Sequence, residues 1–565
     1  MVSAIETSIR PVLFDKKLPK NTRNSLFPGQ EVNSPLKRSF WLGEEFRVKS
    51  RKAEKARVRK QRIRNGRRRI EHRLRDIKWA PQDTPMFKAR NIHYEIAARG
   101  HGLVYGGIGL IHKMVREIGL AEAIDKNLDI LKIHLPYHES DHVLNIAYNS
   151  VMEGTCLEDI ELRRNDEVFL NALGAQRIPD PTTAGDFCRR FHEGHIETLM
   201  TVINDVRLQV WRRQPVEFFE EAIIEGDGTI APTTGECKEG MDISYDGIWG
   251  YHPLVISLAN TQEPLVLMNR SGNRPSHEGA AARFDKAADL CRKAGFRRIK
   301  LRGDTDFSQA RHLDRWDDTG VKFIFGFDAV SVLRSKAESL PATAWRRLVR
   351  PPKYEVKTEL RQRPENVKAR IVKEREFRSI HLGSEDVAEF EYTPTHCKKP
   401  YRMVVCRKNL TIERGVREIV DDIRYFFYIT NERDLSPDEA VFEANDRCNQ
   451  ENLIAQLKNG VRSMKMPVDN LVSNWAYMVM ASLAWSLKAW LALLLPAQGR
   501  WREKHAEEKT TVLRMEFKRF VDTFVRIPAQ IIKTGRRIVY RLLAWNPYLH
   551  VFLRAVEALE HPLRC

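Results

Sequence analysis

Three successive strands are predicted by EAIIEGD (residues 221–227), HPLVISLAN (252–260) and EPLVLMNRSG (263–272), which are short apolar runs bounded by turn residues. The periodicity then becomes helical in HEGAAARFDKAADLCRKAG (277–295), where Gly295 is the expected end of the helix. A strand, a second helix and another strand follow in RRIKLRGD (297–304), SQARHLDRWDDTG (308–320) and VKFIFGFD (321–328). This stretch therefore predicts an α/β domain.

Three strands followed by alternating helices and strands is the order of a ribonuclease-H-like α/β domain. Residues 331 to about 420 alternate in the strand period, with no long helical pattern, and predict a β-rich insertion. YFFYITN (425–431) then returns as an apolar strand. We expect an α/β fold in which a β-rich insertion interrupts a ribonuclease-H-like domain, with helical regions on both sides.

The positive charge of the chain is concentrated in one short run. The 565 residues are enough for several domains, and their formal net charge of +19 points to a polyanionic partner. Residues 47–75 hold fifteen Lys or Arg against Glu54 and Glu71, a local charge of +13. This run can be a solvated tail, an arm that gains order on a nucleic-acid backbone through counterion release, or both in turn.

Two aspartates stand at the ends of predicted strands. Asp227 lies within residues 226–229 (GDGT), where the glycines leave room for ions or a phosphodiester near the backbone. Asp304 follows RRIKLRG and shares a strand face with Lys300 and Arg302. Taken singly, such aspartates are usually turn or cap residues. In a ribonuclease-H-like sheet, however, these two positions are neighbours.

A late helix supplies a third carboxylate. Ser436 and Pro437 can start this helix as N-cap and first helical residue, and we expect it to run through Lys458. Arg447 and Glu451 lie one turn apart on it, and Lys458 returns near the same azimuth. An ordinary surface ion pair would explain Arg447 and Glu451 alone. Beside the two aspartates, this helix face instead offers a metal-binding acid with two phosphate-binding bases.

Asp227, Asp304 and Glu451 together suit a site for two metal ions. Mg²⁺ prefers hard oxygen ligands, and two ions about 4 Å apart promote in-line displacement at a phosphodiester. Asp306 competes with Asp304 for the second position if the strand continues beyond residue 304. We prefer Asp304 because it directly follows the alternating apolar run. Glu225 and Asp242 are weaker candidates.

The cysteines, the N-terminus and one apolar segment indicate where in the cell the protein is located. The eight cysteines form no Cys-x-x-Cys pair, which favours a reducing, cytoplasmic location without a disulfide framework. Residues 1–17 place charges and Pro11 where a signal peptide would need an apolar core. Residues 471–495 approach the length of a membrane span, but Lys488 lies inside this segment. We expect it to be a buried core helix, and we predict no membrane partner.

Several short motifs accompany the acids. They are Gly106-Gly107, Tyr137-His138-Glu139-Ser140-Asp141-His142, Pro181-Thr182-Thr183, Gly250-Tyr251-His252-Pro253, Ser271-Gly272-Asn273, Pro528-Ala529-Gln530 and Thr534-Gly535-Arg536-Arg537. With these motifs the chain resembles the bacterial insertion-sequence DDE transposases, most of all the family called thirteen-eighty, which is akin to the piggyBac elements and belongs to transposase DDE domain group 1. The resemblance covers roughly residues 90–545.

This resemblance implies cut-and-paste transposition, in which water cleaves a DNA strand and the freed 3′-hydroxyl attacks a second phosphodiester. Asp227, Asp304 and Glu451 would hold two Mg²⁺ ions, which Mn²⁺ can replace, and Arg447 and Lys458 would bind DNA phosphates. The partners would be double-stranded DNA, as terminal inverted repeats and target, and a second copy of the chain, because two ends must be synapsed. The insertion would help organise the transposon ends.

Two positions depart from the pattern of related enzymes. Ala444 stands where relatives carry a tyrosine on the glutamate helix, and Trp345 is the one tryptophan near the insertion that could correspond to a residue that holds a flipped base in some of them. Two alternatives to a transposase stay open. One is a catalytically silent, domesticated DNA-binding protein, and the other is a ribonuclease-H-like nuclease without strand transfer.

The expected organisation has seven segments. In chain order they are a disordered N-terminus (1–46), a basic arm (47–80), a helical DNA-binding or dimerisation region (81–215), the first part of the ribonuclease-H-like domain (216–330), the β-rich insertion (331–420), the second part with the catalytic glutamate helix (421–500) and a basic helical C-terminal region (501–565).

Overall fold

The computed structural model describes residues 101–560, apart from 133, 135, 351–364, 415–416 and 535–536, together with a few single positions between 57 and 68. The predictions for the N-terminus (1–46) and, except for those single positions, for the basic arm (47–80) lie outside the described residues.

The first part of the described chain is helical, as predicted. One helix begins at Glu139, and the Asp141 carboxylate accepts a hydrogen bond from the backbone N–H of the N-cap residue His138. Another begins at Pro181, with Asp180 as its N-cap. The main helices are α2 (Ile108–Glu117), α3 (Leu120–Asn127), α4 (Glu139–Val151), α5 (Ile160–Arg164), α6 (Glu167–Leu173), α7 (Pro181–Arg189) and α8 (Glu193–Trp211).

A large mixed sheet of nine strands follows. In spatial order the strands are β10 (Arg346–Arg347), β11 (Arg378–Tyr392), β12 (Tyr401–Arg414), β13 (Arg417–Thr430), β9 (Lys322–Phe327), β8 (Arg298–Gly303), β2 (Glu221–Gly228), β6 (Leu254–Leu258) and β7 (Glu263–Met268). β2 pairs antiparallel with β6, and β6 pairs antiparallel with β7. On its other side β2 runs parallel to β8, which runs parallel to β9. The predicted strands are therefore present: β2 (Glu221–Gly228), β6 (Leu254–Leu258), β7 (Glu263–Met268), β8 (Arg298–Gly303) and β9 (Lys322–Phe327).

Helices make the crossovers between the parallel strands. α9 (Ala280–Ala294) ends at a left-handed Gly295, as predicted, and packs on β2, β6 and β8. The second predicted helix is shorter than expected and forms α10 (Leu313–Asp318). A small separate sheet joins β3 (Ala231–Pro232), β4 (Asp242–Ile243) and β5 (Trp249–Tyr251).

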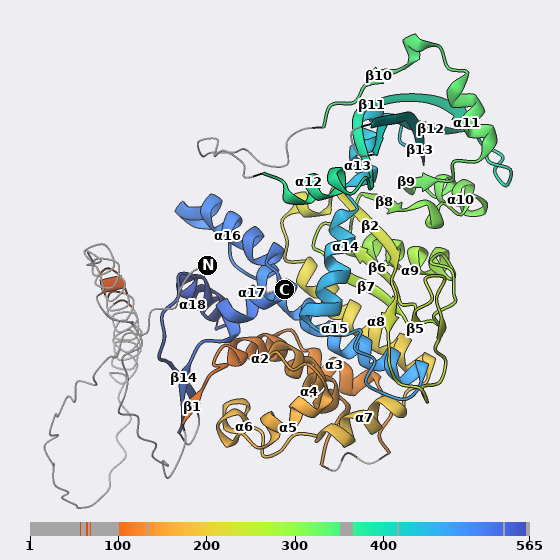
Figure 1. Cartoon of the computed structure of the whole chain (residues 1–565). Helices are drawn as coiled ribbons and strands as arrows, with labels where there is room; N and C mark the ends of the chain where they lie inside the picture. The colour runs from red at the N-terminus through yellow and green to blue at the C-terminus, as the bar shows by residue number, and fades with distance from the viewer. Residues whose placement is uncertain are drawn as a thin grey trace, which may run out of the picture. The chain divides into compact units, whose positions relative to one another are not determined.

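The region predicted as an insertion is rich in strands, and these strands extend the central sheet. β13 crosses the predicted boundary at 420 and pairs antiparallel with β9 (Figure 1). The strands are β10 (Arg346–Arg347), β11 (Arg378–Tyr392), β12 (Tyr401–Arg414) and β13 (Arg417–Thr430), and they are accompanied by α11 (Ser331–Glu338) and α12 (Val367–Glu374).

The segment KARIVKE, whose alternation suggested a strand, is part of helix α12. The Asn366 side chain accepts a hydrogen bond from the backbone N–H of Ala369 and caps this helix. Local capping therefore prevails over the alternating pattern.

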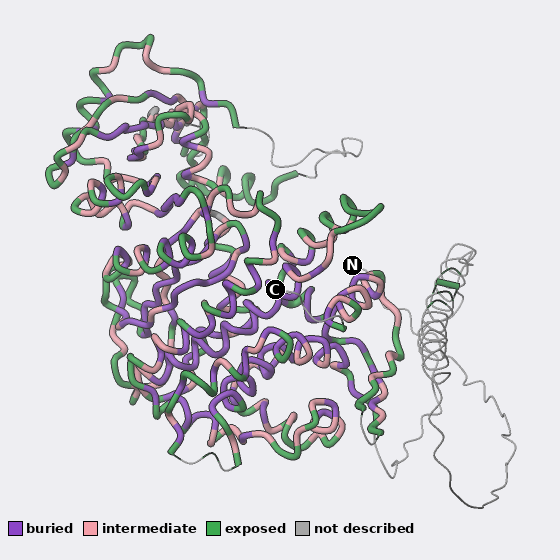
Figure 2. Tube along the Cα trace, turned by 180° about the vertical axis from the view of Figure 1, so that it is seen from behind, coloured by how far each residue is buried: buried purple, intermediate pink, exposed green. Residues whose placement is uncertain are grey.

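The apolar segment 471–495 forms helix α15 (Leu471–Leu493). By length and composition it could cross a membrane, but the whole of its most apolar window is buried within the protein. It packs against α4, α7, α8 and β7. Figure 2 shows that most residues in this part of the protein are buried. The prediction of a core helix is confirmed.

The C-terminal region is only partly helical, in contrast to the prediction. Its helices are α16 (Arg502–Arg514), α17 (Phe517–Phe520) and α18 (Leu549–Ala558), but β14 (Ala529–Thr534) and β15 (Arg537–Leu542) form an antiparallel hairpin. β14 also pairs with β1 (Gly102–Leu103). Along β14, Ala529 and Ile531 are buried and their neighbours less so, which is the strand period.

Candidate active site

Asp227 and Asp304 lie side by side at the ends of two parallel strands. The strand register pairs Glu225 of β2 with Arg302 of β8, and each aspartate lies two residues further on. Asp227 is the penultimate residue of β2, and Asp304 directly follows β8. The carboxyl ends of neighbouring parallel strands meet at one edge of a sheet, so the fold brings the two predicted aspartates together.

The two aspartates face away from α9. A Cβ on Gly226 would come within 2.5 Å of the Phe284 ring of α9, so Gly226 faces that helix. Successive side chains of a strand point to opposite faces, and Asp227 therefore points to the other side. On that side Arg302 donates a hydrogen bond of 2.9 Å to the backbone carbonyl of Glu443 in α13 (Pro437–Asn445).

Buried ion pairs support this side of the sheet. Arg302 Nη2 lies 2.6 Å from Glu225 Oε1, with both side chains 2% exposed, and Lys300 Nζ lies 2.7 Å from Glu443 Oε1. Breaking a buried pair leaves an uncompensated charge, so these contacts hold β2, β8 and α13 in one arrangement. Glu225, a weaker candidate acid, is engaged in this structural pair. Asp242, the other, lies on the short strand β4.

Glu451 lies on α14 (Cys448–Ala455), and its neighbour Gln450 fastens that helix to the sheet. Gln450 Nε2 donates a hydrogen bond of 3.0 Å to the Val255 carbonyl, and its Oε1 accepts one from the Ser257 hydroxyl. Val255 is the β6 partner of Asp227 in the strand register. Gln450 therefore fixes α14 next to the strand that carries the first aspartate.

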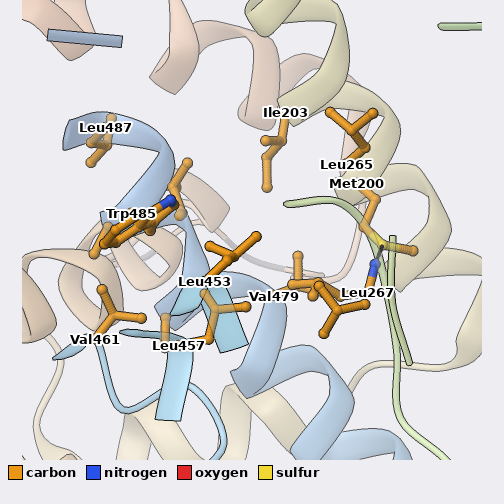
Figure 3. Packing of buried hydrophobic residues seen from close by; sticks show 14 of the residues in the cluster. Met200, Ile203, Leu265, Leu267, Leu453, Leu457, Val461, Val479, Trp485 and Leu487 are labelled. Carbon is orange, nitrogen blue, oxygen red and sulfur yellow. Dashed lines mark hydrogen bonds between the residues drawn. The ribbon is translucent and has the colours of Figure 1, made fainter. Parts of the chain in front are cut away.

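The apolar face of the same segment is anchored in the core. Leu453, Leu457 and Val461 recur every four residues and are almost completely buried. Figure 3 shows them in the buried apolar cluster that also contains Val479 and Trp485 of α15. Glu451 remains 60% exposed, so a buried support carries an accessible carboxylate.

The helix predicted to run unbroken through Lys458 has two interruptions. α13 begins at Pro437 with a Ser436 capping box, as expected, but ends at Asn445, and Arg447 is the N-cap of α14. Residues Gln456–Gly460 form a π-helical turn, a feature frequent at functional sites. The apolar spacing of four residues does not distinguish α from π turns.

Arg447 lies beside Glu451, as its spacing predicts, but also beside Asp304, whereas Lys458 interacts electrostatically with Asp227. Arg447 Nη1 lies 3.5 Å from Asp304 Oδ2, and its Nη2 lies 3.9 Å from Glu451 Oε1. Lys458 lies on the π turn and is half-buried. Burial lowers the pKa of Lys458, and the negative charge of Asp227 opposes that shift. The two cations are thus distributed over all three carboxylates.

The electrostatics of the site fit a bound cation. Burial and the nearby Asp304 charge raise the pKa of Asp227 to about 7, against the effect of Arg447, and Glu451 adds to the rise. Burial likewise raises the pKa of Asp304. Carboxylates crowded in this way are costly to ionise together, and a divalent cation would relieve the repulsion. Their oxygen atoms are the donors that Mg²⁺ prefers.

The chain turns at Asp304, so the condition that would favour Asp306 is not met. The backbone N–H of Asp306 donates a 3.0 Å hydrogen bond to Asp304 Oδ1, which caps the short helix Thr305–Phe307. Asp304 is half-buried, whereas Asp306 is exposed.

Two further side chains lie at the site but were not predicted as site residues. Gln450 belongs to no motif. His252 borders the strand end that carries Asp227, because a Cβ on Gly228 would lie 2.8 Å from its Nε2, and its Nδ1 lies 2.6 Å from the Arg274 carbonyl oxygen. The Gly250-Tyr251-His252-Pro253 motif was the signal that could have identified it.

The two departures from related enzymes have structural counterparts. Ala444 is 5% exposed and packs with Ile324 and Val441 in a small apolar cluster, so this position supplies no hydroxyl group. The Arg407 guanidinium carbon lies 4.1 Å from the ring centroid of Trp345, which is half-buried. One face of that indole is therefore already covered.

A second group of potential metal ligands lies outside the candidate active site. In the described part of the chain, one group of His, Cys, Asp or Glu side chains has three ligand atoms within 4.8 Å of one another, namely His134, His138 and Glu139. None of these residues lies on the elements that carry Asp227, Asp304 or Glu451.

The fold and site define a mixed α/β protein whose sheet presents two aspartates at one edge, with a helical glutamate and two cations beside them. The chain belongs to the family described as transposase DDE domain group 1, whose model matches residues 88–563. The family predicted from the sequence motifs is confirmed, and the protein is a DDE transposase by family.

Among solved structures, the chain is similar to the transposase in the cryo-EM structure of a piggyBac transposase synaptic complex with hairpin DNA. The identity is 10%, the match covers 82% of this chain and 81% of that chain, and the TM-score is 0.34. None of the curated proteins matches this chain.

Proposed function

We propose that this protein cleaves DNA strands and transfers them at the terminal inverted repeats of an insertion sequence, by a cut-and-paste route. The observation that carries the proposal is the meeting of Asp227 and Asp304 at the ends of β2 and β8, with Arg447 between Asp304 and Glu451. Family membership supplies the reaction class.

We infer that the catalytic domain is ribonuclease-H-like. The strand order β7-β6-β2-β8-β9, with antiparallel pairs on one side of β2 and parallel pairs on the other, supports this inference. The three antiparallel strands β11, β12 and β13 continue the sheet at β9, in the place expected of an insertion.

Asp227, Asp304 and Glu451 would hold two Mg²⁺ ions, with Mn²⁺ as a substitute. When bound, these ions would activate the attacking hydroxyl and stabilise the departing oxygen of a phosphodiester. Arg447 would hold a DNA phosphate near Asp304 and Glu451, and Lys458 would do so near Asp227. Both would offset negative charge that develops in the transition state.

The partners we propose are double-stranded DNA, as inverted repeats and as target, and a second copy of the chain that holds the other end. The net charge of +19 supports a nucleic-acid partner. A cytoplasmic location, on the nucleoid when DNA is bound, is part of the same proposal.

The test uses the purified full chain and a DNA fragment carrying the inverted repeats that flank its reading frame, with Mg²⁺ or Mn²⁺. Wild type is compared with Asp227→Asn, Asp304→Asn and Glu451→Gln. Asp289→Asn is the matched control, since Asp289 is exposed on α9 and pairs with Arg292. Loss of several kcal/mol of transition-state stabilisation predicts at least a ~100-fold slower cleavage in the three acid variants.

The outcomes separate the alternatives. Cleaved ends joined to a second DNA molecule support the transposase. Cleavage without joined products indicates a nuclease without strand transfer. Binding of the ends by wild type without cleavage indicates a silent DNA-binding protein.

A further inference from the structure

We propose that His134, His138 and Glu139 form a second metal site, for a divalent transition-metal ion of the zinc type. The site lies at the connection between α3 and the first turn of α4, and it is separate from the three carboxylates of the candidate active site. His138 and Glu139 belong to the motif Tyr137–His142, to which the proposed DNA chemistry assigns no role.

The ligand atoms are already close together. His134 Nε2 lies 3.1 Å from Glu139 Oε2, and the two imidazole rings stack with centroids 4.7 Å apart. Ligands about 2.0–2.1 Å from a tetrahedral zinc ion are separated from one another by about 3.3 Å. The observed spacing is therefore close to that of two ligands on one ion.

Glu139 provides the independent evidence for a ligand. Its side chain is 1% exposed, and Oε1 accepts hydrogen bonds from the backbone N–H groups of Ile130 and Leu131, at 3.1 and 2.8 Å. Oε2 is also buried and accepts no hydrogen bond of acceptable geometry, although His134 Nε2 lies 3.1 Å away. A buried carboxylate oxygen that is not properly hydrogen-bonded is costly, and this one lies within 4.8 Å of a ligand atom of each histidine.

The donor set selects the class of ion. Two imidazoles and one carboxylate are typical zinc ligands, and three protein ligands leave the fourth position to water. Mg²⁺ and Ca²⁺ prefer oxygen ligands and would not favour two histidines. His134 and His138 are exposed, so the ion can reach the site from solvent.

The bound ion would fasten the connection between α3 and α4. Asp125 of α3 already accepts hydrogen bonds from the backbone N–H and hydroxyl of Ser140, at 2.8 and 2.9 Å, and Glu139 holds residues 130 and 131. Ligation of His134 would tie that residue as well to the start of α4. Because α4 packs against α15, the ion would stabilise the junction between the helical region and the core.

The experiment measures zinc binding by the full-length chain, in a background in which Asp227→Asn, Asp304→Asn and Glu451→Gln remove the candidate catalytic ligands. After chelation and dialysis, ZnCl₂ is titrated by calorimetry, and CoCl₂ is added in parallel to record visible absorption. We expect one zinc ion per chain in this background and the Co²⁺ bands of a site with histidine ligands. His134→Asn and His138→Asn should weaken zinc binding at least ~10-fold, whereas the exposed His396→Asn should not change it.

The exposed histidines keep the test independent of folding, since Glu139→Gln alters a buried group that the fold itself uses. Zinc should also raise the melting temperature of the background chain, but not that of His134→Asn. If no zinc binds, or if both histidine variants bind zinc as the background does, the proposal is wrong and His134 is only an ion-pair partner of Glu139. DNA cleavage is not a readout here, so this result is independent of the proposed transposition.

Discussion

The guanidinium of Arg447 lies 3.5 Å from the Asp304 carboxylate, across 143 positions of sequence. Its other terminal nitrogen lies 3.9 Å from Glu451, so one cation joins the strand acid to the helix acid. Both contacts are long for hydrogen bonds, and the Arg447 side chain is 32% exposed. These long, partly exposed contacts are compatible with the proposed role of Arg447, in which it would exchange them for a DNA phosphate.

Replacing Arg447 should affect chemistry more than stability. Partly exposed ion pairs contribute about 0–1 kcal/mol, so Arg447→Ala should change the free energy of unfolding by less than about 1 kcal/mol. Its cleavage rate should fall by roughly 10- to 100-fold, and Arg447→Lys should lie between, because lysine keeps the charge but loses the two-pronged geometry. Single-turnover cleavage and urea denaturation measure the two effects. Arg292→Ala on α9 is the control, and a wild-type rate in Arg447→Ala would contradict the assigned role.

The identity of the second acid can be tested by two neighbouring substitutions. Asp304→Asn should abolish cleavage, whereas Asp306→Asn should keep it within about threefold of wild type, because Asp306 is exposed and only its backbone N–H contacts Asp304. Cleavage of end-labelled DNA at saturating Mg²⁺ gives the comparison. The reverse ranking would move the metal-binding role to Asp306.

The strands that position Asp227 and Asp304 could be predicted from the sequence alone. Apolar alternation ends at Gly226 and Gly303, so Asp227 and Asp304 could be placed at strand ends, and the parallel register of β2 and β8 makes them neighbours. These features depend on local periodicity and on the geometry of a sheet. Ser436 and Pro437 likewise fixed the start of α13.

The features that escaped prediction depend on tertiary contacts or local capping. Gln450 acquires its role only because β6 lies beside α14, which no spacing within the helix reveals. The basic residues of the hairpin β14–β15, Lys533, Arg537 and Arg541, recur every four residues, which a helix would also accommodate. The pairing of β14 with β1 joins the two ends of the described chain. Lys458 lies on a π turn that the period of 3.6 residues does not describe, and there the charge of Asp227 acts on its pKa.

Replacing Gln450 should lower the stability of the protein and also displace Glu451 from its position in the site. The side chain is 2% exposed, and Gln450→Leu would leave the Val255 carbonyl and the Ser257 hydroxyl without this partner. We expect a loss of about 1–3 kcal/mol in the free energy of unfolding, together with slower cleavage because α14 is no longer fastened beside β2. Urea denaturation and cleavage assays report the two effects.

Adding Ser257→Ala to Gln450→Leu should restore part of the stability, since it removes one of the unpaired groups. Asn449→Ala is the control, because its side chain only contacts the carbonyl of Asp446 at 3.2 Å on the exposed side. Strictly additive losses in the double variant would show that the two side chains are not coupled.

Lys488 makes the stability of the core helix depend on pH. It is 0% exposed within α15, donates a 2.6 Å hydrogen bond to the Leu513 carbonyl, and its Nζ lies 3.9 Å from the Trp485 ring centroid. Burial lowers the pKa of Lys488 from 10.5 to about 7, and Glu263 opposes the shift. The folded chain therefore releases this proton near pH 7, whereas the unfolded chain keeps it up to about pH 10.5.

Between those two values the unfolded state binds more protons, so the contribution of Lys488 to the free energy of unfolding rises with pH and is least favourable below pH 7. Lys488→Met removes the titrating group while retaining the apolar stem. Its stability advantage over wild type should be largest near pH 6, at most about 5 kcal/mol, and should shrink toward pH 9.5, where the lost hydrogen bond costs about 1 kcal/mol. Urea denaturation at pH 6, 8 and 9.5 measures this trend, with the exposed Lys504→Met as control. A difference that does not vary with pH would mean that Lys488 stays charged inside the fold, held by the Leu513 carbonyl and the Trp485 ring.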